Sequence, residues 1–126
     1  MANFNLSFVL LSFFVLLLVS FNSGTSMAQV VPAGTKSWCV AKPSASEAEL
    51  KNNINYVCNQ LGYYQCNMIQ EGGPCFSPNT LINHASIVMN IYFQKNGRTA
   101  STCSFTSSGL MVLSDPSYGS CSYPFY

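Results

Sequence analysis

Few side chains in this 126-residue sequence could perform covalent chemistry. Glycoside hydrolysis usually needs two carboxyl groups that face one bond, and the chain has only four acidic residues. Glu47 and Glu49 fit the first turn of a helix, so Glu71 and Asp115 are the only pair left. Each lies in a Gly- or Pro-containing turn, where local hydrogen bonds are expected. There is no Gly-x-Ser-x-Gly elbow or phosphate-binding glycine loop. The sequence therefore favours binding over catalysis.

The six cysteines are better explained as disulfides than as reactive groups. They are Cys39, Cys58, Cys66, Cys75, Cys103 and Cys121. No pair has the two-to-four-residue spacing of a zinc knuckle, and the only histidine, His84, is expected to be structural. An even number of cysteines that follow a sequence typical of a signal peptide, described below, predicts three disulfides. We expect no metal and no cofactor. Spacing alone does not select among the possible pairings.

Aromatic side chains with neutral polar neighbours are typical of carbohydrate recognition. All seven tyrosines lie after residue 28, in a part of the chain whose five basic and four acidic residues nearly cancel. Aromatic faces can bind the apolar faces of sugar rings without net charge. We expect sugar-binding candidates at Tyr63, Tyr64, Gln70, Asn79, Asn90, Tyr118 and Tyr123. The alternative is a core role, which we expect for Trp38, Phe76, Tyr92 and Phe105.

The first 28 residues contain no charged side chain, and they are typical of a secretory signal peptide. The apolar run from Phe8 to Phe21 is 14 residues long, which is shorter than the roughly 20 residues that cross a bilayer. Ser26 and Ala28 suit cleavage after Ala28, although a basic n-region is missing. We predict a signal peptide over 1–28, a flexible lead over 29–37 and one domain over 38–126.

Charge and length also limit the partners. The net charge of +1 offers no strong field for nucleic acid or an anionic membrane. The C-terminal sequence SCSYPFY is too short and too polar for a lipid-anchor signal. We therefore expect a secreted, soluble monomer in the extracellular space, without nucleic acid and without a membrane anchor.

Two helices and a hairpin are predicted to position these residues. Ser46 and Glu49 form a capping box, and Gly62 can end the helix that follows. Its buried stripe is Leu50, Ile54, Val57, Cys58 and Leu61. Residues 62–78 should be a loop held by disulfides.

A second helix is predicted to open with Pro78 at its first position and to end near Lys95 and Gly97. Its expected stripe is Leu81, Ala85, Val88, Met89 and Tyr92. Residues 103–105 and 110–113, joined by a turn at 106–109, should form a hairpin.

Together these residues resemble carbohydrate-binding module family 43, a plant six-cysteine domain found in callose-binding proteins, olive-type pollen allergens and some endo-1,3-β-glucanases. The resemblance covers residues 38–121. Its motifs are Trp38-Cys39-Val40, Asn55-Tyr56-Val57-Cys58, Cys66-x-x-Ile69-Gln70, Gly73-x-Cys75, Pro78-Asn79-Thr80, His84-Ala85-Ser86, Met89-Asn90-x-Tyr92-Phe93-Gln94, Cys103-x-Phe105, Asp115-Pro116-Ser117 and Cys121.

The resemblance implies a non-catalytic module that binds β-1,3-glucan, such as callose or laminarin. It implies an α+β fold, a small disulfide-stapled domain with two main helices and a small antiparallel sheet. It also implies the disulfides Cys39–Cys103, Cys58–Cys121 and Cys66–Cys75. The chain departs from the family at Gln65, where members usually carry an aspartate, and the loop before Cys66 is longer.

The sequence thus predicts a secreted glucan-binding module of the plant cell wall. Stacking of glucose on exposed tyrosines is the expected mechanism. Two alternatives stay open: a secreted protein that docks on a wall enzyme or receptor, and a small glucan hydrolase. Pull-down on glucan tests the first, and release of reducing sugar from laminarin tests the second.

Overall fold

The structure, a computed structural model, describes Leu10, Pro32 and residues 34–126. The predicted signal peptide, apart from Leu10, and residues 29–31 and 33 of the predicted lead lie outside the described residues. The chain divides into two units, Met1–Pro32 and Ala33–Tyr126, and the second unit holds the elements that follow.

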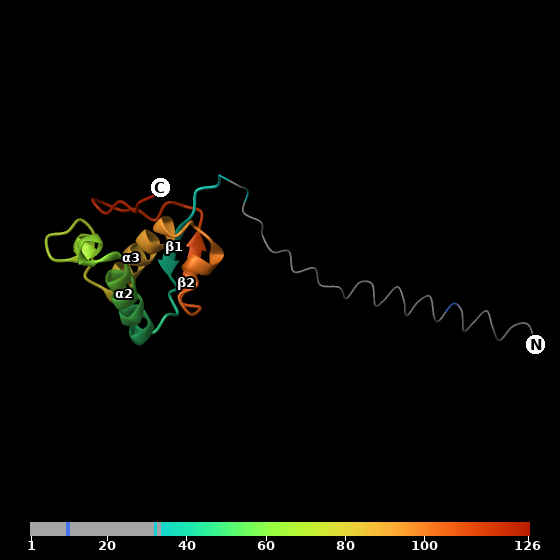
Figure 1. The fold of residues 1–126 in the computed structure, drawn as a ribbon, viewed down its shortest axis with the longest axis horizontal. Helices are drawn as coiled ribbons and strands as arrows, with labels where there is room; N and C mark the ends of the chain where they lie inside the picture. The colour runs from blue at the N-terminus through green and yellow to red at the C-terminus, as the bar shows by residue number, and fades with distance from the viewer. Residues whose placement is uncertain (1–9, 11–31, 33) are drawn as a thin grey trace, which may run out of the picture. The chain divides into compact units, whose positions relative to one another are not determined.

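Short elements alternate with two long helices in this unit (Figure 1). In chain order they are strand β1 (Trp38–Ala41), helix α2 (Glu47–Leu61), 3₁₀ helix η1 (Tyr63–Ile69), helix α3 (Leu81–Lys95), 3₁₀ helix η2 (Ala100–Cys103) and strand β2 (Gly109–Val112). The strands pair antiparallel, with Trp38 opposite Val112 and Ala41 opposite Gly109. The predicted α+β class, with two main helices and a small antiparallel sheet, is confirmed.

Helix α2 begins where its capping box predicts. The Ser46 hydroxyl accepts from the Glu49 amide at 3.2 Å, and the Glu49 carboxylate accepts from the Ser46 amide at 2.7 Å. These bonds satisfy two backbone donors that the first turn leaves without partners. At the other end Gly62 has a φ of 83°, a backbone conformation that glycine adopts at little cost. Both predicted ends of the helix are confirmed.

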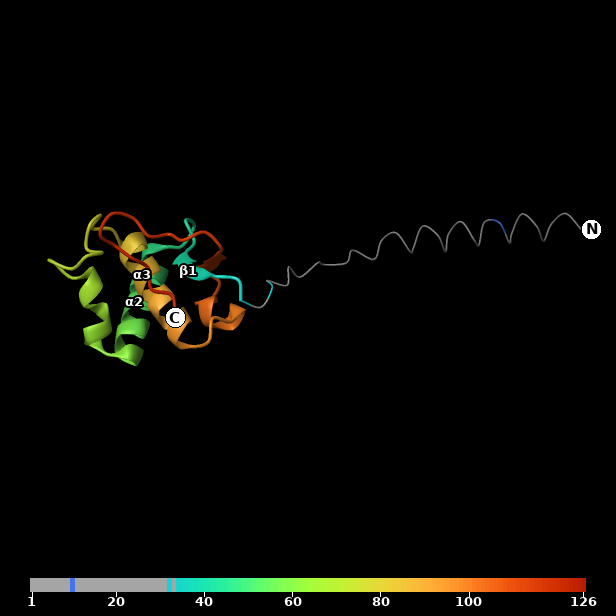
Figure 2. The same cartoon turned by 90° about the horizontal axis from the view of Figure 1, so that it is seen from above.

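Helix α3 begins at Leu81, so the predicted start at Pro78 is wrong. The reason is a local cap: the Thr80 side chain accepts from the Asn83 amide at 3.3 Å, which fixes Thr80 as the residue before the helix. The helix packs against both α2 and β1 (Figures 1 and 2). It is therefore buried over most of residues 85–94 rather than along a single stripe.

The predicted hairpin of residues 103–113 is wrong. Cys103 ends η2, and β2 pairs with β1 instead. Three successive residues explain this, because Phe105, Thr106 and Ser107 have φ angles of 42°, 53° and 68°. Such left-handed backbone cannot form an extended strand, and the chain must reach the sheet by another path.

Three disulfides join these elements: Cys39–Cys103, Cys58–Cys66 and Cys75–Cys121. The first pairing is the one that the resemblance implies. The expected pairings Cys58–Cys121 and Cys66–Cys75 are wrong. Cys58 lies in the last turns of α2, and η1 folds back directly after Gly62, so Cys66 meets it eight residues further on.

Candidate functional site

The predicted sugar-binding residues do not form one site. Tyr63 and Gln70 line a cleft of about 190 Å³ beside η1. Tyr118 lines a second cleft of about 360 Å³. Tyr64 is 82% exposed and Asn79 is exposed ahead of α3, but neither lines a described cleft. These five residues remain predictions.

Asn90 is wrong as a ligand contact, because it is fully buried. Its side-chain oxygen accepts from the Cys39 amide at 3.2 Å and from the Gln94 amide group at 3.2 Å. Its side-chain nitrogen donates to the Pro124 carbonyl at 2.9 Å. The polar residue in the middle of α3 therefore joins strand β1 and the C-terminal segment to the helix, and it has no access to a polysaccharide.

Tyr123 is also wrong as a surface platform, since only 6% of it is exposed. Burial raises the pKa of Tyr123 to about 12, nearby Tyr118 adds to the rise, and a hydrogen bond with Ser86 opposes it. An unfolded tyrosine ionises near pH 10. The folded state is therefore stabilised in full below pH 10, and this contribution is lost as the pH rises toward 12.

We expect Tyr123→Phe to remove this part of the alkaline loss of stability, because phenylalanine cannot ionise. Urea unfolding of both proteins at pH 8 and at several values between pH 10 and 11 measures it. The difference in unfolding free energy between wild type and variant should shrink or reverse over this range. A difference that is independent of pH would contradict the burial of the Tyr123 hydroxyl.

Of the two candidate catalytic carboxyl groups, Glu71 and Asp115, the second is held by local hydrogen bonds. Asp115 accepts from the Ser117 hydroxyl at 2.6 Å and from the Ser117 amide at 2.9 Å, and these bonds lower the pKa of Asp115. A carboxylate that ionises so readily is a poor general acid. The His84 ring lies 2.8 Å from the Phe76 carbonyl, as expected for a structural histidine.

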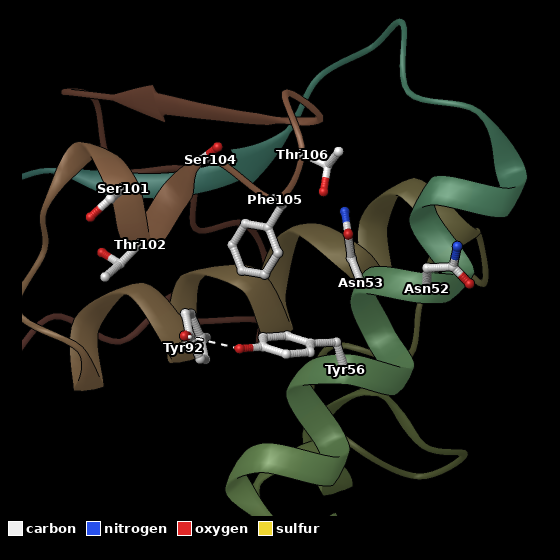
Figure 3. A pocket seen from close by; sticks show the side chains of 9 residues that line it. All are labelled: Asn52, Asn53, Tyr56, Tyr92, Ser101, Thr102, Ser104, Phe105 and Thr106. Atoms are coloured by element: carbon white, nitrogen blue, oxygen red, sulfur yellow. Dashed lines mark hydrogen bonds between the residues drawn. The ribbon is translucent and has the colours of Figure 1, made fainter.

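A third cleft lies between the two long helices and the segment that follows α3 (Figure 3). Its volume is about 390 Å³. We call it the aromatic groove. Its lining residues are Asn52, Asn53, Tyr56, Tyr92, Ser101, Thr102, Ser104, Phe105 and Thr106. None of these side chains carries a formal charge at neutral pH.

Three rings form the apolar part of the groove. Tyr56 from α2 and Tyr92 from α3 meet edge to face with ring centroids 5.6 Å apart, and Phe105 packs in the same way on Tyr92 at 5.5 Å. Figure 3 shows Phe105 reaching toward the two tyrosines from the opposite wall. Tyr56 is 48% exposed, so part of its ring remains available to a ligand.

The tyrosine hydroxyls of the groove lie 3.4 Å apart. This hydrogen bond with Tyr56, together with partial burial, raises the pKa of Tyr92 above its ordinary value of 10.0. Tyr92 is therefore uncharged at neutral pH. The groove combines apolar ring faces with hydroxyl and amide groups, and no carboxyl group lines it. It can bind a neutral, hydroxyl-rich ligand, but it offers no acid and base for hydrolysis.

The wall that carries Phe105 is built from strained backbone that several bonds hold in place. The Ser108 hydroxyl donates to the Phe105 carbonyl at 2.5 Å and accepts from the Asn53 side chain at 2.8 Å. The Cys39–Cys103 disulfide fixes the start of this segment. A left-handed backbone conformation costs free energy at residues other than glycine. Such residues persist where several surrounding contacts hold them, often at binding sites. The structure therefore presents Phe105 to the groove in a fixed position.

The expected sugar-binding residues do not include those of this groove. Tyr56 was not among the expected ligand contacts, and Tyr92 and Phe105 were expected in the core. A signal was present in α2, where Asn52 and Tyr56 are four residues apart and thus share one face.

The described residues show neither a metal cluster nor a membrane span. No group of three His, Cys, Asp or Glu side chains among them could hold a metal ion. Within the same residues, no helix is long and apolar enough to cross a membrane.

Fold, disulfides and sequence define the class of this protein. Residues 37–110 match the family model of the X8 domain, and the chain belongs to this family, the six-cysteine module that the sequence resembles. It is 49% identical over 90 residues to major pollen allergen Ole e 10 of olive, covering 71% of this chain and 72% of the allergen.

Two further relatives are named for β-1,3-glucan. A glucan endo-1,3-β-glucosidase of wheat is 53% identical over 91 residues, which cover 72% of this chain but only 19% of the wheat protein. Plasmodesmata callose-binding protein 5 of Arabidopsis thaliana is 40% identical over 87 residues, covering 69% of this chain and 48% of that protein. The chain thus spans about a fifth of the glucanase and about half of the callose-binding protein.

Proposed function

We propose that this domain binds β-1,3-glucan in the plant cell wall without cleaving it, and that the aromatic groove holds the sugar. The observation that carries the proposal is the groove itself, which joins exposed aromatic faces to a rim of uncharged hydroxyl and amide groups. A wheat glucanase and a callose-binding protein among the relatives support this choice of polysaccharide.

The size and polarity of the groove suit a short stretch of a neutral glucan chain. Ligand sites commonly measure about 300–1,000 Å³ and combine apolar walls with a few placed polar groups. A glucose ring can stack on the exposed part of Tyr56, and the Asn52 amide and the Ser104 and Thr106 hydroxyls lie at the rim to bond its hydroxyls. Because no charge has to be desolvated, binding should vary little with salt.

Export is part of the proposal. Three disulfides suit an oxidising compartment, and the predicted signal peptide over 1–28 would deliver the chain there. We propose that the domain acts outside the cell as a monomer, with the polysaccharide as its partner and without nucleic acid. No catalytic step is required, since Glu71 and Asp115 do not line the groove.

We expect Tyr56→Ala to weaken binding of a laminarin oligosaccharide about tenfold, which corresponds to about 1.4 kcal/mol. The variant should remain folded, because Tyr56 is about half exposed and lies outside the two buried clusters. Isothermal titration calorimetry measures the affinity, and circular dichroism checks the fold.

Tyr64→Ala is the matched control, since Tyr64 is a more exposed tyrosine that lines none of the described clefts. It should bind as the wild type does if the groove holds the sugar, whereas a loss of affinity would support the sequence-based prediction that Tyr64 contacts the glucan. Tyr63→Ala probes the cleft beside η1, and Tyr118→Ala probes the cleft near Phe76. If one of these three variants loses affinity and Tyr56→Ala does not, the proposed site is wrong.

A further inference from the structure

Three of the five basic residues gather around the last two aromatic rings of the chain. The Lys36 ammonium lies 5.3 Å from the centroid of the Phe125 ring, and the Arg98 guanidinium lies 4.7 Å from the same centroid. The Lys95 ammonium lies 5.8 Å from the Tyr126 ring. We call these five residues the cationic–aromatic patch. None of them lines the aromatic groove.

The rings of the patch are held by a fixed backbone. The Pro124 carbonyl accepts from Asn90, and the Tyr126 amide donates to the Gln94 side chain at 3.4 Å. Figure 2 shows this C-terminal segment passing over α3. The Phe125 ring also packs on Trp38, with centroids 5.8 Å apart. Buried amides of α3 and a buried indole thus position both rings at the surface.

The charges of the patch are not neutralised by ion pairs. Within residues 34–126 the only salt bridge joins Lys51 to Glu47, away from the patch. The Asp115 carboxylate is held by the Ser117 hydroxyl and amide, and Lys36 adds a smaller electrostatic effect that also lowers the pKa of Asp115. All three cations are exposed, so their charge is available to a ligand.

Exposed rings beside exposed cations fit one kind of ligand well. A sugar ring that carries a carboxylate has an apolar face for stacking and an anionic edge for a cation, and Arg98 can hold a carboxylate through two parallel bonds. Tyr126 is 62% exposed, which leaves ring area for stacking, whereas the Phe125 ring is already contacted by Trp38, Lys36 and Arg98 and holds the two cations beside it. A neutral glucan would use the rings but not the charges.

We propose that the cationic–aromatic patch binds an acidic polysaccharide whose sugar rings carry carboxylates, at a surface separate from the aromatic groove. The domain would then join an acidic polymer to the ligand of the groove. This inference does not rest on the proposed glucan binding, because the two surfaces share no residue.

Titration of the oxidised protein with polygalacturonate, measured by calorimetry, tests the patch. Fully methyl-esterified polygalacturonate is the matched ligand, since it keeps the sugar backbone and loses the charge. We expect binding of the acidic form that weakens at least fivefold between 50 and 300 mM salt (roughly, from screening), and much weaker binding of the ester. Equal affinity for both polymers would overturn the proposal.

Variants separate this site from the groove. We expect the double variant Lys95→Gln/Arg98→Gln to weaken polygalacturonate binding about tenfold, and Tyr126→Ala to weaken it a few-fold. Lys51→Gln, which removes one exposed positive charge outside the patch, is the control and should bind normally. Laminarin affinity should be unchanged in all three.

Two other results would contradict the inference. If Lys51→Gln weakens binding as much per removed charge as the double variant does, the effect comes from net charge and not from the patch. If poly-glutamate or vesicles of anionic phospholipid bind as tightly as polygalacturonate, the ring faces contribute nothing and the surface does not recognise a sugar acid.

Discussion

Replacing Cys39 and Cys103 together by alanine is expected to lower the free energy of unfolding by about 4 kcal/mol. The bond closes a loop with a sequence separation of 64, the longest of the three, so its loss frees the largest part of the unfolded chain. Both cysteines are buried between β1, α3 and η2. For so small a domain, this is a large part of the total stability. Urea unfolding of the otherwise oxidised protein measures the change.

The Cys58→Ala/Cys66→Ala variant is the control for this prediction. Its disulfide closes a separation of only 8, so the same chain-entropy argument gives a loss of about 2.5 kcal/mol. A larger loss for the short loop than for the long one would contradict the account. The long-loop variant should also bind laminarin more weakly, because Cys103 anchors the segment that presents Phe105 to the groove.

Replacing Asn90 by alanine is expected to cost about 3 kcal/mol of stability. The change leaves the Cys39 amide and the Pro124 carbonyl without their partner, and each buried polar group left unpaired costs about 1–3 kcal/mol. The buried Gln94 side chain also loses one contact. Thermal unfolding followed by circular dichroism measures the loss, and titration with laminarin below the transition measures binding.

Asn79→Ala is the matched control, since Asn79 is an exposed asparagine ahead of α3. It should change the free energy of unfolding by no more than about 0.5 kcal/mol. A folded Asn90→Ala protein with normal stability but no glucan affinity would contradict the structural role of Asn90 and support direct contact with the ligand.

Helix α2 could be predicted from the sequence because its signals are local. The Ser46–Glu49 box acts within three residues, and Gly62 ends the helix through its own backbone. The predicted start of α3 at Pro78 was three residues too early because Thr80 provides the cap and Leu81 is the first helical residue. A proline at the first helical position and a capping threonine are both common helix starts, and only the fold selects between them.

The groove could not be predicted because its parts meet only in three dimensions. Phe105 is the first of three successive left-handed residues. The residue types Phe-Thr-Ser do not predict such a backbone, since left-handed conformations are usually adopted by glycine or asparagine. Tyr92 packs against the hydrophobic core and also lines the groove. The hydrogen-bond partners of Asn90, Cys39 and Pro124, could not be predicted either, because each is more than thirty residues away in the sequence.

Affinity electrophoresis is the experiment that decides whether this X8 domain binds β-1,3-glucan. The oxidised domain, with three disulfides confirmed by mass, would be run in gels that contain laminarin, a mixed-linkage glucan or a soluble cellulose derivative. We predict retardation by laminarin, little or none by the cellulose derivative, and loss of most of the retardation in Tyr56→Ala. Unretarded migration of the wild-type protein in all three gels would contradict glucan binding and favour docking on a protein of the wall.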